Sequence, residues 1–100
     1  MNNLKLEITS KAYCDIETIS DFIANDNKNA AAKLVKLFYK TFKTLCKHPN
    51  LGKRRPDFTY LDVKFYVIKK NYLIVYRTLD NATLRILRVL TTYQDICSNL

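Results

Sequence analysis

The pattern of apolar and polar residues predicts a short strand and a first amphipathic helix at the start of the chain. Apolar and charged residues alternate from Leu4 to Ile8, which is typical of a half-buried strand. Thr9 and Ser10 are good helix caps, and the apolar residues that follow recur at helical spacing. The predicted apolar stripe consists of Tyr13, Ile16, Ile19 and Ile23, with Asp15, Glu17 and Asp21 outside it.

A second helix is predicted over about residues 30–47, after a polar break at residues 25–29 whose last residue, Asn29, can serve as its cap. Its apolar face consists of Ala31, Val35, Phe38, Phe42 and Leu45. Its opposite face carries Lys33, Lys36, Lys40, Lys43 and Lys47. The lysine stripe is typical of a solvated helix face, and it could also grip phosphates. The short loop predicts that the two helices form an antiparallel hairpin.

The second half of the chain predicts three sequential strands. Residues 48–52 end the helix, residues 53–55 (KRR) form a basic connector, and alternation resumes from Val63 to Ile68. A turn at residues 69–71 then leads into a β-hairpin over residues 72–90, broken by the polar residues 80–83. Strand alternation predicts that Arg88 shares a face with Leu84, Ile86 and Leu90, and that Arg85 points the other way.

These elements predict an α+β fold over a single domain, residues 1–100. An N-terminal short strand precedes an antiparallel two-helix hairpin, which packs on a three- to four-stranded antiparallel sheet. One hundred residues with 48% hydrophobic composition suffice for one core.

Charge and cysteine content limit the classes of partner, metal site and disulfide that the chain can be expected to have. Seventeen Lys and Arg against nine Asp and Glu give a net charge of +8, which favours an acidic partner such as nucleic acid, an anionic membrane surface or an acidic protein segment. Such a charge is also compatible with nothing more than solubility. Three cysteines without a C-x-x-C pair, and a single histidine, His48, indicate neither a zinc site nor a disulfide framework. We expect a cytoplasmic protein with no membrane span, no cofactor and no small-molecule substrate.

No nucleophile–base set is apparent, so the basic residues of the predicted sheet are the remaining candidates for chemistry. Lys64, Arg77, Arg85 and Arg88 lie near several tyrosines in the sequence. Metal-free RNA cleavage requires a base, an acid and cations for the phosphate, all of which such residues can provide. The alternative is a structural role in which the arginines pair with acids such as Asp62, Asp80 and Asp95.

Four segments resemble ParE-type toxins of the RelE/ParE superfamily. Residues 26–32 (DNKNAAA) resemble the family's loop and helix start, and residues 48–52 (HPNLG) with Arg55 resemble its P-x-L-G-x-x-R segment. Residues 72–77 (YLIVYR) resemble its aromatic strand ending in Y-R, and residues 86–90 (ILRVL) followed by Asp95 resemble its closing strand. The four occur in the family's order and spacing.

The resemblance implies the toxin of a type II toxin–antitoxin module, silenced by a cognate acidic antitoxin whose disordered tail folds around it. The ParE branch is associated with poisoning DNA gyrase, which makes gyrase the expected target. The RelE branch cleaves mRNA in the ribosome, which leaves an endoribonuclease as the alternative. The expected target-binding residues are Arg54, Arg55, Arg77 and Arg88. The expected catalytic residues of a nuclease are Lys64, Arg77, Arg88 and Tyr93.

Two positions depart from the family pattern. ParE-like proteins often have histidine after the last strand and arginine before the final aspartate, where this chain has Thr91 and Gln94. These departures leave a third interpretation open, an inactive relative that retains antitoxin binding. The resemblance indicates no particular antitoxin-binding residues.

Overall fold

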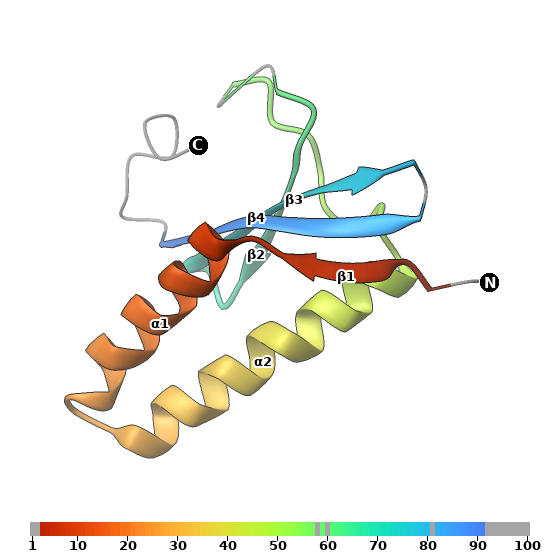
Figure 1. Ribbon diagram of the computed structural model, residues 1–100. Coiled ribbons are helices and arrows are strands. Elements are labelled where there is room, and N and C mark those ends of the chain that lie inside the picture. The colour runs from red at the N-terminus through yellow and green to blue at the C-terminus, as the bar shows by residue number, and fades with distance from the viewer. Residues whose placement is uncertain (1–2, 58, 60, 81, 92–100) are drawn as a thin grey trace.

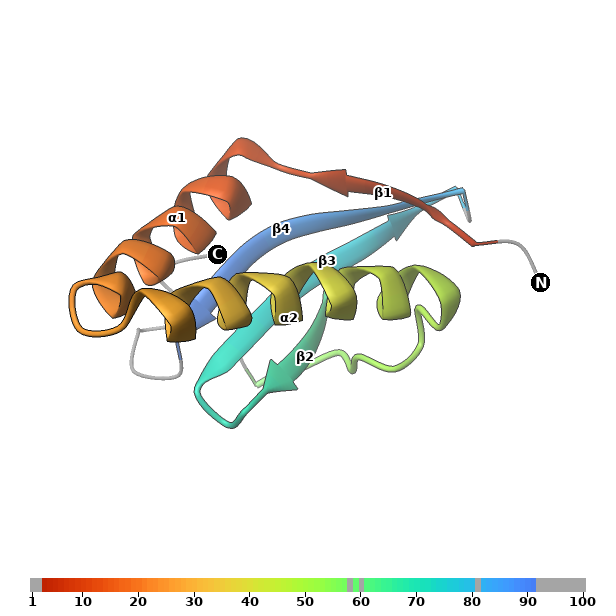
Figure 2. The same cartoon turned by 90° about the horizontal axis from the view of Figure 1, so that it is seen from below.

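The helices and strands follow the predicted order, and the predicted hairpin lies in the middle of the sheet (Figure 1). The computed structural model describes residues 3–57, 59, 61–80 and 82–91. The elements are β1 (Lys5–Ile8), α1 (Ser10–Ala24), α2 (Lys28–Lys47), β2 (Lys64–Ile68), β3 (Tyr72–Leu79) and β4 (Thr83–Thr91). The four strands are arranged in the order β1-β4-β3-β2. Both helices lie on the same face of this sheet (Figures 1 and 2). The α+β class is therefore confirmed.

One pair of strands differs from the predicted antiparallel sheet: β1 runs parallel to β4, whereas β2–β3 and β3–β4 are antiparallel. The direction of β1 follows from the packing of α1. The chain passes from Ile8 directly into α1, which contacts the second half of β4. Because α1 continues along that edge, β1 must run beside the first half of β4 in the same direction.

The helix boundaries and faces refine the predictions. The side chain of Thr9 caps α1 by accepting a hydrogen bond from the backbone N–H of Ala12 at 3.2 Å. Asn27, not the predicted Asn29, caps α2 by accepting from the N–H of Ala30 at 3.0 Å, so this helix begins two residues earlier than expected. In α1, Ala12 rather than Tyr13 joins Ile16 in the core, and Tyr13 is 51% exposed.

Apolar residues pack on both faces of the sheet. The helix-side core lies between the helices and the sheet, and it includes Phe38, Phe42, Ile74 and Tyr76. The outer core lies on the opposite face and consists of Val63, Phe65, Leu73, Val75 and Leu90, with Leu87 packed against it. The five lysines of the α2 stripe are all exposed, so that face of the helix is solvated.

A β-bulge in β4 changes which residues share a face. The partner of Val75 is Arg88 whereas the partner of Tyr76 is Ile86, so Leu87 is an extra residue in β4. Leu84 and Ile86 consequently belong to the helix-side core and Leu90 belongs to the outer core. The prediction that Arg88 and Leu90 share a face with Leu84 and Ile86 is therefore wrong, because strict alternation ends at the inserted residue.

Candidate functional site

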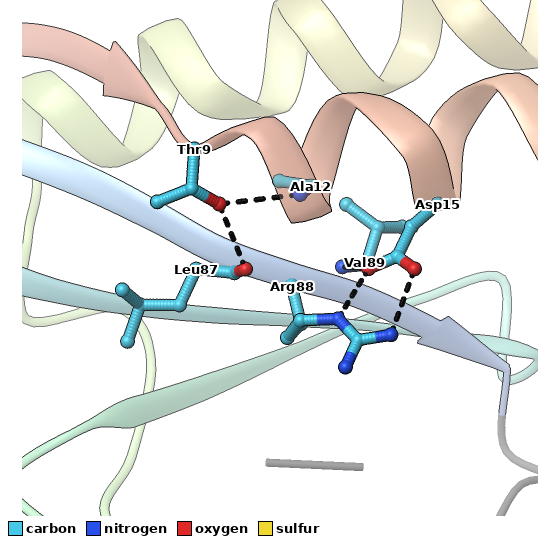
Figure 3. Close-up of polar contacts among 6 residues, drawn as sticks. All are labelled: Thr9, Ala12, Asp15, Leu87, Arg88 and Val89. Atoms are coloured by element: carbon cyan, nitrogen blue, oxygen red, sulfur yellow. Dashed lines mark hydrogen bonds and ion pairs between the residues drawn. The ribbon is translucent and has the colours of Figure 1, made fainter.

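The second half of β4 extends beyond β1, and residues of α1 cover its exposed edge (Figure 3). The backbone N–H of Thr9 donates to the carbonyl oxygen of Ile86 at 3.1 Å, and the Thr9 hydroxyl donates to that of Leu87 at 2.9 Å. The N–H of Val89 donates to Oδ2 of Asp15 at 3.0 Å. Thr9, the N-cap of α1, and the Asp15 side chain thus satisfy backbone groups that a neighbouring strand would otherwise bind.

Arg88 completes this α1–β4 clasp (Thr9, Asp15 and Arg88) through a bidentate ion pair with Asp15 (Figure 3). Its Nε donates to Oδ2 at 2.7 Å and its Nη2 donates to Oδ1 at 2.9 Å. The exposed fractions of the two side chains are only 19% and 14%. Hydrogen bonding to Asp15 raises the pKa of Arg88 above its usual value, so the guanidinium stays charged. Arg88, a predicted target-binding and catalytic residue, is held in a structural contact.

The sequence placed Asp15 outside the apolar stripe of α1 but did not predict its contact with the edge of β4. Asp15 precedes the buried Ile16 on a helix that packs along the β4 edge, and the carboxylate points at that edge. Its position at the border of the apolar stripe was the available indication, since border residues of a helix contact whatever flanks the core.

Tyr76 joins β3 to the connector that follows α2, in what we call the Tyr76 junction (Pro49, Gly52 and Tyr76). The buried Tyr76 hydroxyl donates to the carbonyl oxygen of Pro49 at 2.7 Å and accepts from the N–H of Gly52 at 2.8 Å. Burial raises the pKa of Tyr76, so the hydroxyl remains protonated and keeps its donor role. Two of the four family-like segments, residues 48–52 and 72–77, therefore touch each other in the fold.

Glycine is required at position 52 because the tyrosine ring lies against it. A Cβ atom built on Gly52 would lie 2.6 Å from Cε1 and 2.8 Å from Cζ of Tyr76, and closer still to its hydroxyl oxygen. Tyr76 is wedged in the helix-side core, so the ring has no room to retreat. The single glycine of the chain is thus explained by a close approach between backbone and ring.

Lys64 and Arg77 lie on opposite faces of the sheet. Lys64 is the cross-strand partner of Tyr76, which faces the helices, and Arg77 follows Tyr76 and so faces away from them. The Lys64 ammonium donates to Oδ1 of Asn50 at 2.8 Å, close to the Tyr76 junction. The strand backbone therefore separates two of the residues expected to act together in a nuclease.

Arg77 and Arg85 are direct cross-strand partners, and Glu7 of β1 is the partner of Arg85 on its other side. The Arg85 Nε donates to Oε1 of Glu7 at 2.7 Å. The side chain of Arg77 is exposed and forms no hydrogen bond or ion pair with any residue that the structure describes. We call these three residues the arginine row.

Arg54 and Arg55 lie on the connector, exposed and close to carboxylates. The Nε of Arg54 is 3.8 Å from Oδ1 of Asp62, an acid that we expected to pair with an arginine of the sheet instead. Arg55 donates to both carboxylate oxygens of Asp57, at 3.0 and 2.8 Å, and these hydrogen bonds lower the pKa of Asp57. Both pairs are open to solvent, which leaves these arginines accessible to a partner.

The predicted site residues thus fall into separate places. Arg88 is in the α1–β4 clasp, Lys64 is beside the Tyr76 junction, and Arg77 is in the arginine row. Tyr93 and Gln94 lie outside the described residues, and Thr91 is the last residue of β4. The geometry brings Arg77 together with Arg85, which the family-like segments did not include.

An apolar pocket of about 380 Å³ opens between α1 and the end of the hairpin. Its lining includes Ile19, Ile23 and Tyr72, together with Phe22, which is 75% exposed. The exposed Lys69 and Lys70 directly precede Asn71, which also lines the pocket. The pocket therefore has a largely apolar lining that also includes the charged Asp15, and two lysines precede one of its lining residues along the chain.

The described part of the chain provides little for other chemistry. Within it, no three His, Cys, Asp or Glu side chains are grouped closely enough to hold a metal ion. Burial raises the pKa of the Cys46 thiol, which keeps it protonated and unreactive. Neither α1 nor α2 is both long and apolar enough to cross a membrane. The solvent-exposed features of the described residues include the basic and apolar surfaces given above.

Comparison with known proteins gives one family and one fold. A family described as the ParE toxin of the type II toxin–antitoxin system parDE matches residues 6–96. A solved structure of the chromosomal ParDE system from P. aeruginosa contains a similar chain, with a TM-score of 0.72 and 23% identity over 88% of this chain and 95% of that chain. At this identity the structural similarity speaks for the fold. No curated protein matches the chain.

Proposed function

The chain belongs to the ParE toxin family of type II toxin–antitoxin systems, and from this premise we propose that it arrests growth by binding DNA gyrase and that a cognate acidic antitoxin neutralises it. The observation that carries the proposal is the extent of the family match. It begins at the second residue of β1 and continues past the end of β4, so it includes the whole of the other helices and strands that the structure describes.

Two features of the fold support a binding protein over an enzyme. The expected nuclease residues Lys64 and Arg77 face opposite sides of the sheet, and Arg88 is engaged by Asp15 in the α1–β4 clasp. A phosphate cannot be contacted from both sides of a strand at once. No contact among the described residues favours the endoribonuclease alternative.

The charge and the pocket of the protein support the proposal that its antitoxin is acidic and partly apolar. The net charge of +8 attracts a negatively charged chain and accelerates its association. The pocket beside Phe22 has the size and lining to accept an apolar side chain, and Lys69 and Lys70 lie next to it along the chain. An antitoxin segment with an apolar anchor flanked by Asp or Glu fits this combination.

Induced expression in a bacterial host tests the proposal. Wild-type protein should arrest growth with signs of DNA damage, and the purified protein should make gyrase accumulate cleaved DNA. Replacing Arg54 and Arg55 together by alanine should weaken both effects, because these exposed arginines are expected to contact the target. Alanine at Lys36 and Lys43 of α2 removes the same charge elsewhere and serves as the control.

Two results would count against gyrase binding. Unimpaired growth at confirmed soluble expression would favour an inactive relative, in keeping with Thr91 and Gln94. Codon-phased cuts in mRNA, mapped by their 5′ ends during induction, would favour the endoribonuclease.

A further inference from the structure

The arginine row places two like charges directly opposite each other on the sheet. Arg77 and Arg85 are register partners in adjacent antiparallel strands, so their Cβ atoms lie about 5 Å apart. Like charges in this position repel each other and destabilise a sheet. Neither side chain is buried, so packing does not require arginine at either position.

Glu7 neutralises only part of this charge. It binds Arg85 through a single hydrogen bond, from Nε to Oε1 at 2.7 Å. The two terminal nitrogens of Arg85 form no hydrogen bond with any described residue, and the guanidinium of Arg77 forms neither a hydrogen bond nor an ion pair with one. Lys5, two positions before Glu7 on β1, is also exposed, so cations outnumber carboxylates across these strands.

We propose that Arg77 and Arg85 together bind one carboxylate of an acidic protein segment. Two arginines that are register partners can offer N–H donors to the two oxygens of one carboxylate. A bound anion also removes the repulsion between the two arginines. The inference rests on the proposed function, because the acidic segment is that of the neutralising antitoxin.

The surroundings favour a protein carboxylate over a nucleic-acid backbone. A backbone requires a track of cations that follows successive phosphates. Arg77 and Arg85 are instead flanked by Glu7 on β1, and the next residue on the same face of β3 is Val75 of the outer core. A single anion beside apolar residues is the expected partner of such a surface.

Titration of the intact protein with oligoglutamate, followed by NMR of the arginine side chains and by calorimetry, tests this proposal. Wild-type protein should bind the peptide with shifts at Arg77 and Arg85. Arg77→Gln should weaken binding by about tenfold, the loss expected for a charge-assisted hydrogen bond. Lys36→Gln on α2 removes the same charge elsewhere and should change binding less than about twofold.

Arg77→Lys is a second variant that preserves the charge and removes the planar fork, and it should bind several-fold more weakly than wild type. An equal loss in Lys36→Gln would overturn the proposal in favour of net charge alone. Absence of binding to wild type, or tighter Arg77-dependent binding of oligothymidylate, would overturn it too. Failure of the proposed function would instead appear as the absence of growth arrest, a measurement without peptide.

Discussion

Two arginines with the same kind of partner differ in their surroundings. Arg88 and Arg55 each form a bidentate pair with an aspartate, but the first pair is largely buried against β4 whereas the second is open to water. In addition, Asp15 accepts a backbone hydrogen bond from Val89, so its carboxylate ties together a helix, a strand edge and a side chain. Solvent exposure therefore decides how much each pair contributes to stability.

Arg88→Ala should lower the free energy of unfolding by about 3 kcal/mol, because it leaves the carboxylate of Asp15 buried without its cation. Arg55→Ala, which opens a pair already surrounded by water, should leave stability almost unchanged. Urea denaturation of both variants measures the difference. Equal losses would show that the α1–β4 clasp contributes no more than a surface pair.

The close approach of Gly52 and Tyr76 in the Tyr76 junction predicts the effect of a substitution at Gly52. Gly52→Ala should destabilise the fold by about 1–3 kcal/mol, because its Cβ overlaps the Tyr76 ring. In a Tyr76→Phe background the hydroxyl oxygen is absent, so the same change should cost less. A double-mutant cycle by urea denaturation measures this coupling. Full additivity would mean that the two residues do not interact.

Elements with a regular hydrophobic period were predicted well from the sequence, whereas the inserted residue in β4 was not predicted. The apolar face of α2 and the alternation of β2 follow from residue spacing, since each is set by one uninterrupted backbone period. In β4, the extra residue Leu87 reverses the alternation, and neither side of the bulge carries a glycine or proline to mark it. The contact of Asp15 with β4 was not predicted for a related reason, because it depends on Val89, which is 74 positions away in the sequence.

The turn between β2 and β3 contains two residues with strained backbone angles. Lys69 and Lys70 adopt positive φ angles of 51° and 65°, a region that costs roughly 1 kcal/mol for a residue with a Cβ. Lys70→Gly should therefore stabilise the protein by about 0.5–1 kcal/mol. Lys40→Gly, the same change inside α2, should destabilise it by about 1 kcal/mol. In thermal unfolding, the melting temperature should rise for Lys70→Gly and fall for Lys40→Gly.

For the whole molecule, the family, the α+β class and the basic character were predictable from the sequence, whereas the grouping of the site residues was not. Motif order and net charge are properties of the sequence alone. The pairing of Arg77 with Arg85 depends on the register of β3 and β4, and the register depends on the turn and the bulge between their ends. Four expected target-binding arginines accordingly lie in three different settings.

The net charge of +8 predicts how the protein should associate with an acidic antitoxin. Long-range attraction accelerates encounter and is screened by salt. The association rate constant should fall by about tenfold or more between low and high salt, with a much smaller change in dissociation. Stopped-flow fluorescence measures both rates. A salt-independent association rate would mean that the charge does not steer the encounter.

The parallel pairing of β1 with β4 also sets the order in which the protein can assemble on the ribosome. Glu7 and Arg85 are neighbours in the sheet although they are 78 positions apart, so the first strand to be synthesised must wait for the last. The helical hairpin can form early from local contacts, while closing the sheet requires nearly all of the described chain. A ParE-type chain of this design therefore gains the complete surface of its sheet only after β4 has been synthesised.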